Sequence, residues 1–280
     1  MRRQMRRSLD KESTGDQGGR LEGCGASQYV DVHCHCLPGL DDGPATIPES
    51  VALCRALADD GIAAVIATPH QLGRFDGAYS TTKIRLAVAD LSRTLSEQRI
   101  PLTVLPGADV RVDERIPQLL KSDRILTLAD TGKYILLELP DVVFVDIEPL
   151  IEELVALKVT PIISHPERHD IMARRPEMIF RWVENSARLQ VTAASLLGCF
   201  GSQVETVAWQ IFKSGWVSLV ATDAHNLNSR RPLMAEAFRL ISTRFDEDIA
   251  RLVCIENPAR VVKGQDLLTV RPPKRREVDG

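Results

Sequence analysis

Short apolar runs alternate with longer amphipathic stretches along this chain of 280 residues, and this alternation most strongly constrains its fold. Residues 63–68 have the continuous apolar character of a buried strand, and residues 83–98 then show helical periodicity. Strands that alternate with helices form parallel sheets, because each helix carries the chain back to the same end of the sheet. About seven such units favour a closed α/β barrel over a small open sheet.

The strand–helix pattern fills residues 28–270, which we expect to form a single barrel domain. Residues 1–27 mix arginine, glycine, serine and aspartate without apolar periodicity, and residues 271–280 combine two prolines with alternating charges. Because such segments bury little apolar surface, we expect disordered tails at both ends. The basic run at residues 1–7 has no apolar segment behind it, so it is interpreted as a solvated charge run.

Composition argues against several classes of protein. The net charge of −3 and the 5% aromatic content give no basic, ring-rich surface for nucleic acid. No segment approaches the roughly 20 apolar residues of a membrane span, so stable membrane insertion is not expected. The six cysteines lack the paired spacing of a zinc ribbon. We interpret them as reduced thiols of a cytoplasmic protein.

The histidines indicate where the chemistry lies. Five of the six fall at or just beyond the C-terminal end of an expected strand, on the rim where barrel enzymes build active sites. Residues two apart in a strand share a face, so His33 converges with His35, and Asp223 with His225. Neutral imidazole and carboxylate groups suit Zn²⁺, Mn²⁺ or Fe²⁺. The five residues are His33, His35, His70, His165 and His225.

Three carboxylates are expected to join these rings. Asp42 follows the first strand, and Asp109 follows the proline–glycine–alanine end of another. Glu138 lies inside an apolar run, where an unpaired carboxylate is costly unless it binds metal. Asp41, beside Asp42, is assigned instead to a turn or helix cap.

A metal cluster of this kind favours hydrolysis of phosphoesters. Bound metal lets water lose a proton near neutral pH, and the resulting hydroxide attacks a phosphorus or carbonyl centre. Arg168 follows His165 by three residues and Arg230 follows His225 by five. Both are placed to bind phosphate, because the planar guanidinium matches two oxygens at once. Arg231 is expected to be a surface residue.

Six short motifs resemble those of the polymerase and histidinol phosphatase (PHP) superfamily, and more closely its bacterial capsular-type tyrosine-protein phosphatase branch. They occur in the expected order, and the resemblance covers about residues 29–265. The motifs are HCH at 33–35, PGLDDG at 38–43, ATPH at 67–70, LE at 137–138, SHPER at 164–168 and DAHN at 223–226.

The resemblance implies a distorted (β/α)7 TIM-like barrel and a cytoplasmic, metal-dependent tyrosine phosphatase with up to three metals. Manganese is the implied metal, with Fe²⁺ and Zn²⁺ as alternatives. The implied substrate is the phosphotyrosine tail of a membrane-bound bacterial tyrosine autokinase that acts in capsule or exopolysaccharide biosynthesis. The implied metal ligands are His33, His35, Asp42, His70, Asp109, Glu138, His165, Asp223 and His225.

The same resemblance implies that Arg168 and Arg230 hold the phosphate. Two positions depart from the usual pattern of the branch. Asp109 stands where a glutamate is usual, so its role as a ligand stays open. The sequence SRRP at 229–232 also leaves open whether Arg230 or Arg231 binds phosphate.

Three other functions stay open at this point. The same site suits a small phosphate ester such as histidinol phosphate or a nucleotide, because the ligands recognise phosphate and not its alcohol. A non-catalytic metal-binding regulator is another alternative. A thiol phosphatase would use Cys254 and Arg260, which have Cys-x5-Arg spacing. That loop lacks the glycines needed to turn its amides toward phosphate, and Asn257–Pro258 is interpreted as a helix start.

Overall fold

The structure is a computed structural model that describes residues 29–140, 143–169 and 175–269. The tails predicted at residues 1–27 and 271–280 lie outside these ranges, as does the basic run at residues 1–7. Within the described ranges, no helix is both long enough and apolar enough to cross a membrane.

The strands form two parallel sheets, which confirms the predicted α/β class. The first sheet has the order β1-β2-β4, with β1 (Tyr29–Cys34), β2 (Ile62–Ala67) and β4 (Thr103–Pro106). The second has the order β3-β5-β6-β7-β8-β9. Its strands are β3 (His70–Gln71), β5 (Asp109–Arg111), β6 (Tyr134–Glu138), β7 (Thr160–Ser164), β8 (Arg188–Thr192) and β9 (Val217–Ala221).

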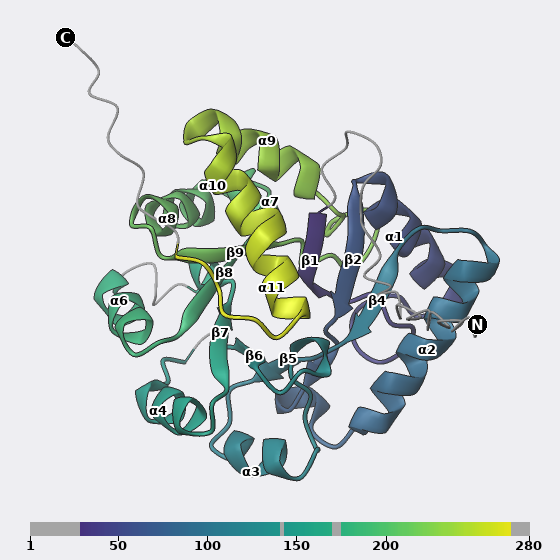
Figure 1. Cartoon of the computed structure of the whole chain (residues 1–280), viewed down its shortest axis with the longest axis horizontal. Helices are drawn as coiled ribbons and strands as arrows, with labels where there is room; N and C mark the ends of the chain where they lie inside the picture. Colours follow the sequence, from purple (N-terminus) through teal and green to yellow (C-terminus); the bar gives the residue numbers. More distant parts are fainter. Residues whose placement is uncertain (1–28, 141–142, 170–174, 270–280) are drawn as a thin grey trace, which may run out of the picture.

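The two sheets are joined at both edges. Along the chain, β3 follows β2 and β5 follows β4, each after two residues. At the other edge, the amide of His35 donates to the carbonyl of Ala224 at 2.9 Å, and that of Asp223 to the carbonyl of His33 at 2.8 Å. These bonds bring the C-terminal ends of β1 and β9 together. The strands thus occupy the centre of the molecule with helices around them (Figure 1).

The helices begin and end where local sequence signals place them. Thr46 and Glu49 form a capping box at the start of α1, and Pro48 lies in its first turn. Ser80 caps α2. The helices are α1 (Ile47–Asp59), α2 (Thr81–Glu97), α3 (Ile116–Lys121), α4 (Glu148–Ala156), α6 (Pro176–Glu184), α7 (Ala193–Leu196), α8 (Ser202–Lys213), α9 (Met234–Arg244), α10 (Glu247–Arg251) and α11 (Asn257–Val262).

Two apolar clusters form the core. The larger one includes the buried faces of the surrounding helices. The smaller one lies among the strands and includes Val32, Ile66, Leu136 and Leu219, with Val261 of α11 packed against them. In Figure 1, α11 crosses the strands. Because apolar side chains occupy this interior, polar groups gather at the C-terminal ends of the strands.

Strand β1 changes the face that it presents before it ends. Val32 belongs to the inner cluster, whereas Cys34, two residues later, belongs to the outer one. Residues two apart in a regular strand share a face, so this change requires an irregularity. The pairing register of β1 with β2 shifts between Asp31 and Cys34. The shift allows His33 and His35 to point into the site at the strand ends.

The helix start predicted at Asn257–Pro258 is confirmed, because α11 begins at Asn257 and Pro258 lies in its first turn. Residues Leu252–Glu256 form a π-helical segment that follows α10 directly and runs into α11. The helical run therefore begins ahead of that position, at Glu247. Proline lacks the N–H that an α-helix needs in its interior, and a π-helical turn just before Pro258 accommodates this loss.

Candidate metal and phosphate site

The structure brings together all nine residues that the sequence nominates as ligands. They come from β1, β3, β5, β6 and the segments just after β1, β7 and β9. They make four overlapping groups, and within each group one ligating atom per residue lies within 4.8 Å of the others. The groups are His35–Asp42–His70–His225, His33–His165–Asp223, His33–His35–Asp109 and His70–Asp109–Glu138.

One half of the cluster surrounds His33. Its Nε2 atom lies 3.2 Å from Nε2 of His35, 3.2 Å from Oδ1 of Asp223 and 3.6 Å from Oδ2 of Asp109. The ring of His33 also stacks on that of His165, with 5.6 Å between their centroids. These nitrogen and oxygen atoms face one another across a space of the size that a metal ion fills.

The other half surrounds His70. Its Nδ1 atom lies 3.4 Å from both Oδ2 of Asp109 and Oε2 of Glu138. Its Nε2 atom lies 3.5 Å from Oδ1 of Asp42, and Nε2 of His225 lies 3.4 Å from that same oxygen. Asp109, despite its shorter side chain than glutamate, therefore reaches both halves of the cluster.

The buried polar atoms of the cluster fit divalent metals. Oδ2 of Asp109, Oδ1 of Asp223 and Nδ1 of His70 are buried and have no hydrogen-bond partner within the described ranges. A buried polar atom without a partner costs free energy, and each of these atoms faces other potential ligands. Divalent cations held by the groups described above would satisfy these atoms.

Protonation states support the same interpretation. Burial lowers the pKa of His33, His35 and His165, and lowers the pKa of His70 to about 4. These rings are therefore neutral at pH 7, which is the form that binds metals. Burial would raise the pKa of Asp223, but the charges of Arg230 and Arg168 beside it hold that pKa well below its usual range. Asp223 is accordingly a carboxylate.

Two buried side chains orient the histidines of β1. Gln190 Oε1 lies 2.9 Å from Nδ1 of His33, and Asp41 Oδ2 lies 2.5 Å from Nδ1 of His35. Each contact fixes which ring nitrogen faces the cluster. The turn role predicted for Asp41 is confirmed, because its Oδ1 accepts from the amide of Gly43. It is incomplete, however, since the contact with His35 was not foreseen. The sequence carried no signal for Gln190.

Three arginines border the cluster. Arg168 and Arg230 both donate to Oδ2 of Asp223, and Nη1 of Arg230 lies 2.9 Å from Nε2 of His225. Arg231 is exposed, as predicted, so Arg230 is the arginine that reaches the cluster. Arg111 was not predicted, and its Nη2 atom lies 3.1 Å from Oε2 of Glu138. The site thus combines buried carboxylates with a rim of guanidinium groups.

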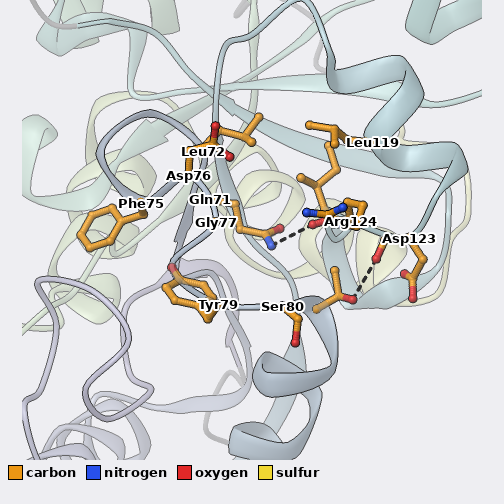
Figure 2. A pocket seen from close by; sticks show the side chains of 12 residues that line it. Gln71, Leu72, Phe75, Asp76, Gly77, Tyr79, Ser80, Leu119, Asp123 and Arg124 are labelled. Atoms are coloured by element: carbon orange, nitrogen blue, oxygen red, sulfur yellow. Dashed lines mark hydrogen bonds between the residues drawn. The ribbon is translucent and has the colours of Figure 1, made fainter.

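A cavity of about 250 Å³ opens onto the cluster. Arg111, Arg168 and Arg230 line it, and Phe75 forms an apolar part of its wall. The ring of Phe75 stacks on His70 at 5.6 Å and 13°. In Figure 2 this ring points away from the neighbouring pocket around Gln71. The arrangement suits an anion carried on a flat organic group.

The loop that holds Phe75 is fixed to the site. The hydroxyl of Tyr79 donates to the carbonyl of His70, and the amide of Phe75 donates to the carbonyl of Leu72 at 3.0 Å. The side chain of Gln71 accepts from the amide of Leu126 at 2.9 Å. Tyr79 therefore anchors the loop, while Phe75 faces the cavity.

The thiol-phosphatase alternative does not fit this geometry. Cys254 is fully buried within the π-helical segment, and burial raises the pKa of its thiol. Arg260 donates to the carbonyl of Asp266 on a different part of the surface. A buried, protonated thiol is not a nucleophile, so Cys254 and Arg260 do not form a thiol-phosphatase site.

Comparison with known proteins identifies the family of this chain and its relatives. Residues 29–263 match the protein family described as capsular polysaccharide synthesis, CpsB/CapC. The tyrosine-protein phosphatase YwqE of Bacillus subtilis is 34% identical over 256 residues, which span 90% of this chain and 99% of YwqE. The tyrosine-protein phosphatase CpsB of Streptococcus agalactiae serotype V is 26% identical over 242 residues, which span 84% of this chain and 98% of CpsB.

The chain is also similar to solved structures of known proteins. The structure described with YwqE from Bacillus subtilis and CpsB from Streptococcus pneumoniae, as metal-dependent tyrosine phosphatases, superposes with a TM-score of 0.82. The identity is 32%, and the match covers 88% of this chain and 98% of that one. The phosphotriesterase homology protein of Escherichia coli gives a TM-score of 0.54 at 12% identity, covering 85% of this chain and 99% of that one. This second likeness concerns the fold alone.

Proposed function

This chain belongs to the CpsB/CapC family of capsular polysaccharide synthesis proteins, and on that premise we propose that it is a metal-dependent protein-tyrosine phosphatase. The observation that carries the proposal is the convergence of nine histidine and carboxylate side chains beside an arginine-lined cavity. Phosphate monoester hydrolysis uses both parts. The cluster supplies sites for divalent cations, and the arginines supply charge for the phosphate.

The ligands we propose are the nine residues of the four groups, and they have room for up to three ions. Manganese is the metal we propose, with Fe²⁺ and Zn²⁺ as alternatives, since mixed imidazole and carboxylate ligands suit all three. When bound, such metals lower the pKa of water and stabilise charge on the transferring phosphoryl group. Gln190 and Asp41 would keep the rings of His33 and His35 in the orientation that binds them.

Arg168 and Arg230 would bind the phosphate oxygens. Both guanidinium groups lie at the cavity, and both reach Asp223. The ring of Phe200 lies 4.9 Å beneath the guanidinium of Arg168 and orients it. Arg111, beside Glu138, would add a third positive charge at the opposite side of the cavity.

The fold we propose for the domain is a single distorted (β/α)7 TIM-like barrel. The hydrogen bonds between the ends of β1 and β9 support closure of the barrel. The chain also passes from one sheet to the other twice, from β2 to β3 and from β4 to β5, which joins the sheets at their other edge. If β2 with β3, and β4 with β5, are each counted as one barrel strand, the barrel has seven strands. The two-residue breaks between β2 and β3 and between β4 and β5 account for the distortion of the barrel.

The substrate we propose is the phosphotyrosine tail of a membrane-bound bacterial tyrosine autokinase in capsule or exopolysaccharide biosynthesis. The family description and the names of the relatives support this choice. Phe75 also supports an aromatic ester, because its ring forms a wall of the cavity beside His70. The enzyme would act in the cytoplasm, where kinase tails of this kind lie.

A substrate panel tests the proposal. The Mn²⁺-loaded protein is assayed on a phosphotyrosine peptide, a phosphoserine peptide of the same sequence, histidinol phosphate and a nucleoside monophosphate. We expect the phosphotyrosine peptide to have the highest kcat/KM. A higher kcat/KM on either small ester would replace the proposed substrate class. Metal binding without hydrolysis of any ester would instead indicate a non-catalytic regulator.

A further inference from the structure

Phosphate recognition alone does not select among phosphorylated proteins, so the surface beside the site has to do so. A second cavity, of about 330 Å³, adjoins the site and shares Asp42 and His225 with the metal cluster. Its other walls come from the start of α1 and from the loop after β9. We call it the Leu227 pocket, after the exposed leucine on that loop.

One wall of the Leu227 pocket is apolar. Pro44, Ala52, Leu53 and Leu227 all line it, and Leu227 is 48% exposed. Ala52 and Leu227 supply the accessible apolar surface, because Pro44 and Leu53 are themselves buried. An aliphatic group placed there would remove Leu227 and its neighbours from water.

Two polar atoms of the pocket are already engaged in local structure. Oε2 of Glu49 accepts from the amides of Ala45 and Thr46, as part of the cap of α1. Oδ1 of Asn226 accepts from the amides of Asn228 and Arg230 within its own loop. These atoms therefore have little capacity left for a polar ligand.

The charge of the lining residues excludes one kind of side chain from the pocket. The charged residues that line the pocket are the acidic Asp42 and Glu49, whereas the arginines lie in the site cavity on the other side of Asp42. An acidic side chain would meet like charge in the Leu227 pocket. An aliphatic side chain meets no such penalty.

The pocket on the opposite side of the site is a poorer candidate. It measures about 150 Å³ and adjoins the site cavity through Leu72 and Phe75. Figure 2 shows Asp123 and Arg124 among its side chains. Asp123 is already paired with Arg85. This pocket is smaller and more polar than the Leu227 pocket, so it is a poorer binding site for an apolar side chain.

We propose that the Leu227 pocket is a subsite for an aliphatic side chain that flanks the phosphotyrosine of a peptide substrate. The inference rests on the proposed function, because it requires a phosphotyrosine peptide in the adjoining cavity. With the phosphate at Arg168 and Arg230, the peptide backbone would pass over Asp42 and deliver the flanking side chain to Leu227. The subsite would thereby recognise a residue of the peptide that the phosphate site does not contact.

A peptide series with two site variants tests the inference. Leucine, alanine or aspartate is placed, one position at a time, at the two residues on either side of phosphotyrosine, and free phosphotyrosine serves as the reference. We expect leucine at one position to raise kcat/KM roughly tenfold over alanine, and aspartate to lower it. Leu227→Asn, which removes apolar surface, and Ala52→Leu, which fills the pocket, should both reduce that preference toward unity.

Leu268→Asn is the matched control, because Leu268 is 40% exposed and lies near Asn257 of α11 rather than at the site. It should retain the full leucine preference. The inference is overturned if the wild-type protein shows no flanking preference, or if both pocket variants keep it. Failure of the wild-type protein to hydrolyse free phosphotyrosine and every peptide would instead overturn the proposed function, and the subsite with it.

Discussion

Nδ1 of His35 lies 2.5 Å from Oδ2 of Asp41, and both side chains are almost completely buried. The same oxygen accepts from the amide of His70 at 3.1 Å. Asp41 therefore ties the segment after β1 to β3, and these two parts of the chain carry three of the proposed ligands, His35, Asp42 and His70. A carboxylate in this place holds the ring of His35 with its other nitrogen toward the cluster.

Asp41→Asn should weaken metal binding without unfolding the chain. The amide keeps the shape of the side chain but loses the charge that orients the imidazole. We expect metal affinity to fall roughly 10- to 100-fold, measured by calorimetric titration of Mn²⁺. Asp59→Asn, at an exposed position of α1, is the control and should bind metal normally. Unchanged affinity in Asp41→Asn would show that the contact does not orient the ligand.

Arg168→Ala should lose phosphate binding. Removal of the guanidinium group takes away charge-assisted bonds to the phosphoryl oxygens, and we expect kcat/KM to fall roughly 100-fold. Arg168→Lys should recover only part of the loss, because an ammonium group does not bind two oxygens in parallel. Steady-state kinetics with a phosphotyrosine peptide measure both effects.

Arg231→Ala is the matched control, because Arg231 is exposed and adjacent in sequence to Arg230. Its kcat/KM should stay within about twofold of the wild-type value, as expected for a surface substitution. A large loss in Arg231→Ala together with normal activity in Arg230→Ala would reverse the assignment of the second phosphate-binding arginine.

Gly43→Ala should disturb the loop that carries Asp41 and Asp42. A Cβ atom at this position would lie 2.4 Å from the carbonyl oxygen of His35, so the backbone must move. Overpacking of this kind costs about 1–3 kcal/mol in free energy of unfolding, and metal affinity should fall as well. Thermal unfolding and metal titration measure the two effects.

Gly77→Ala provides the comparison for the previous variant. A Cβ atom there would have nothing within 4 Å, although the φ of +71° carries its own strain. We expect a loss of roughly 1 kcal/mol in stability and normal metal affinity. If Gly43→Ala behaves like Gly77→Ala in both measurements, close packing against His35 does not position the ligand loop.

Cys254→Ala should keep full activity. The thiol is buried within the helical run, and burial raises its pKa, so at neutral pH it is protonated. Loss of the buried sulfur should cost about 1 kcal/mol in stability. Loss of activity in a folded, metal-loaded Cys254→Ala would revive the thiol mechanism.

The alternation in the sequence was sufficient to predict about seven strand–helix units and to nominate side chains that the structure brings together, but not the short strands β3 and β5. The C-terminal ends of parallel strands meet at one edge, so residues such as His70 and Glu138 could be placed together before their geometry was known. The register shift in β1 could not be foreseen, because Val32, His33 and Cys34 have no local signal that marks it. Gln190 and Arg111 were missed for a related reason, since polar residues on strands have many ordinary roles.

The helix start predicted at Asn257–Pro258 is confirmed by α11, although the sequence did not signal the helical run that precedes it. Asparagine followed by proline marks the first turn of α11, and the π-helical segment before it allows the preceding helical run to continue into that turn. For Asp41 the local prediction was correct and incomplete, because turn formation and orientation of His35 use different oxygens of one carboxylate.

The most direct test of the central claim is hydrolysis of a phosphotyrosine peptide by chelator-stripped protein before and after Mn²⁺ is restored, beside His33→Ala. We expect the stripped protein to be inactive and Mn²⁺ to restore hydrolysis in the wild-type chain. His33→Ala should stay at least roughly 100-fold less active, because His33 faces ligands in both of its groups. Full activity after chelation, or full recovery in His33→Ala, would contradict a metal-dependent mechanism at this site.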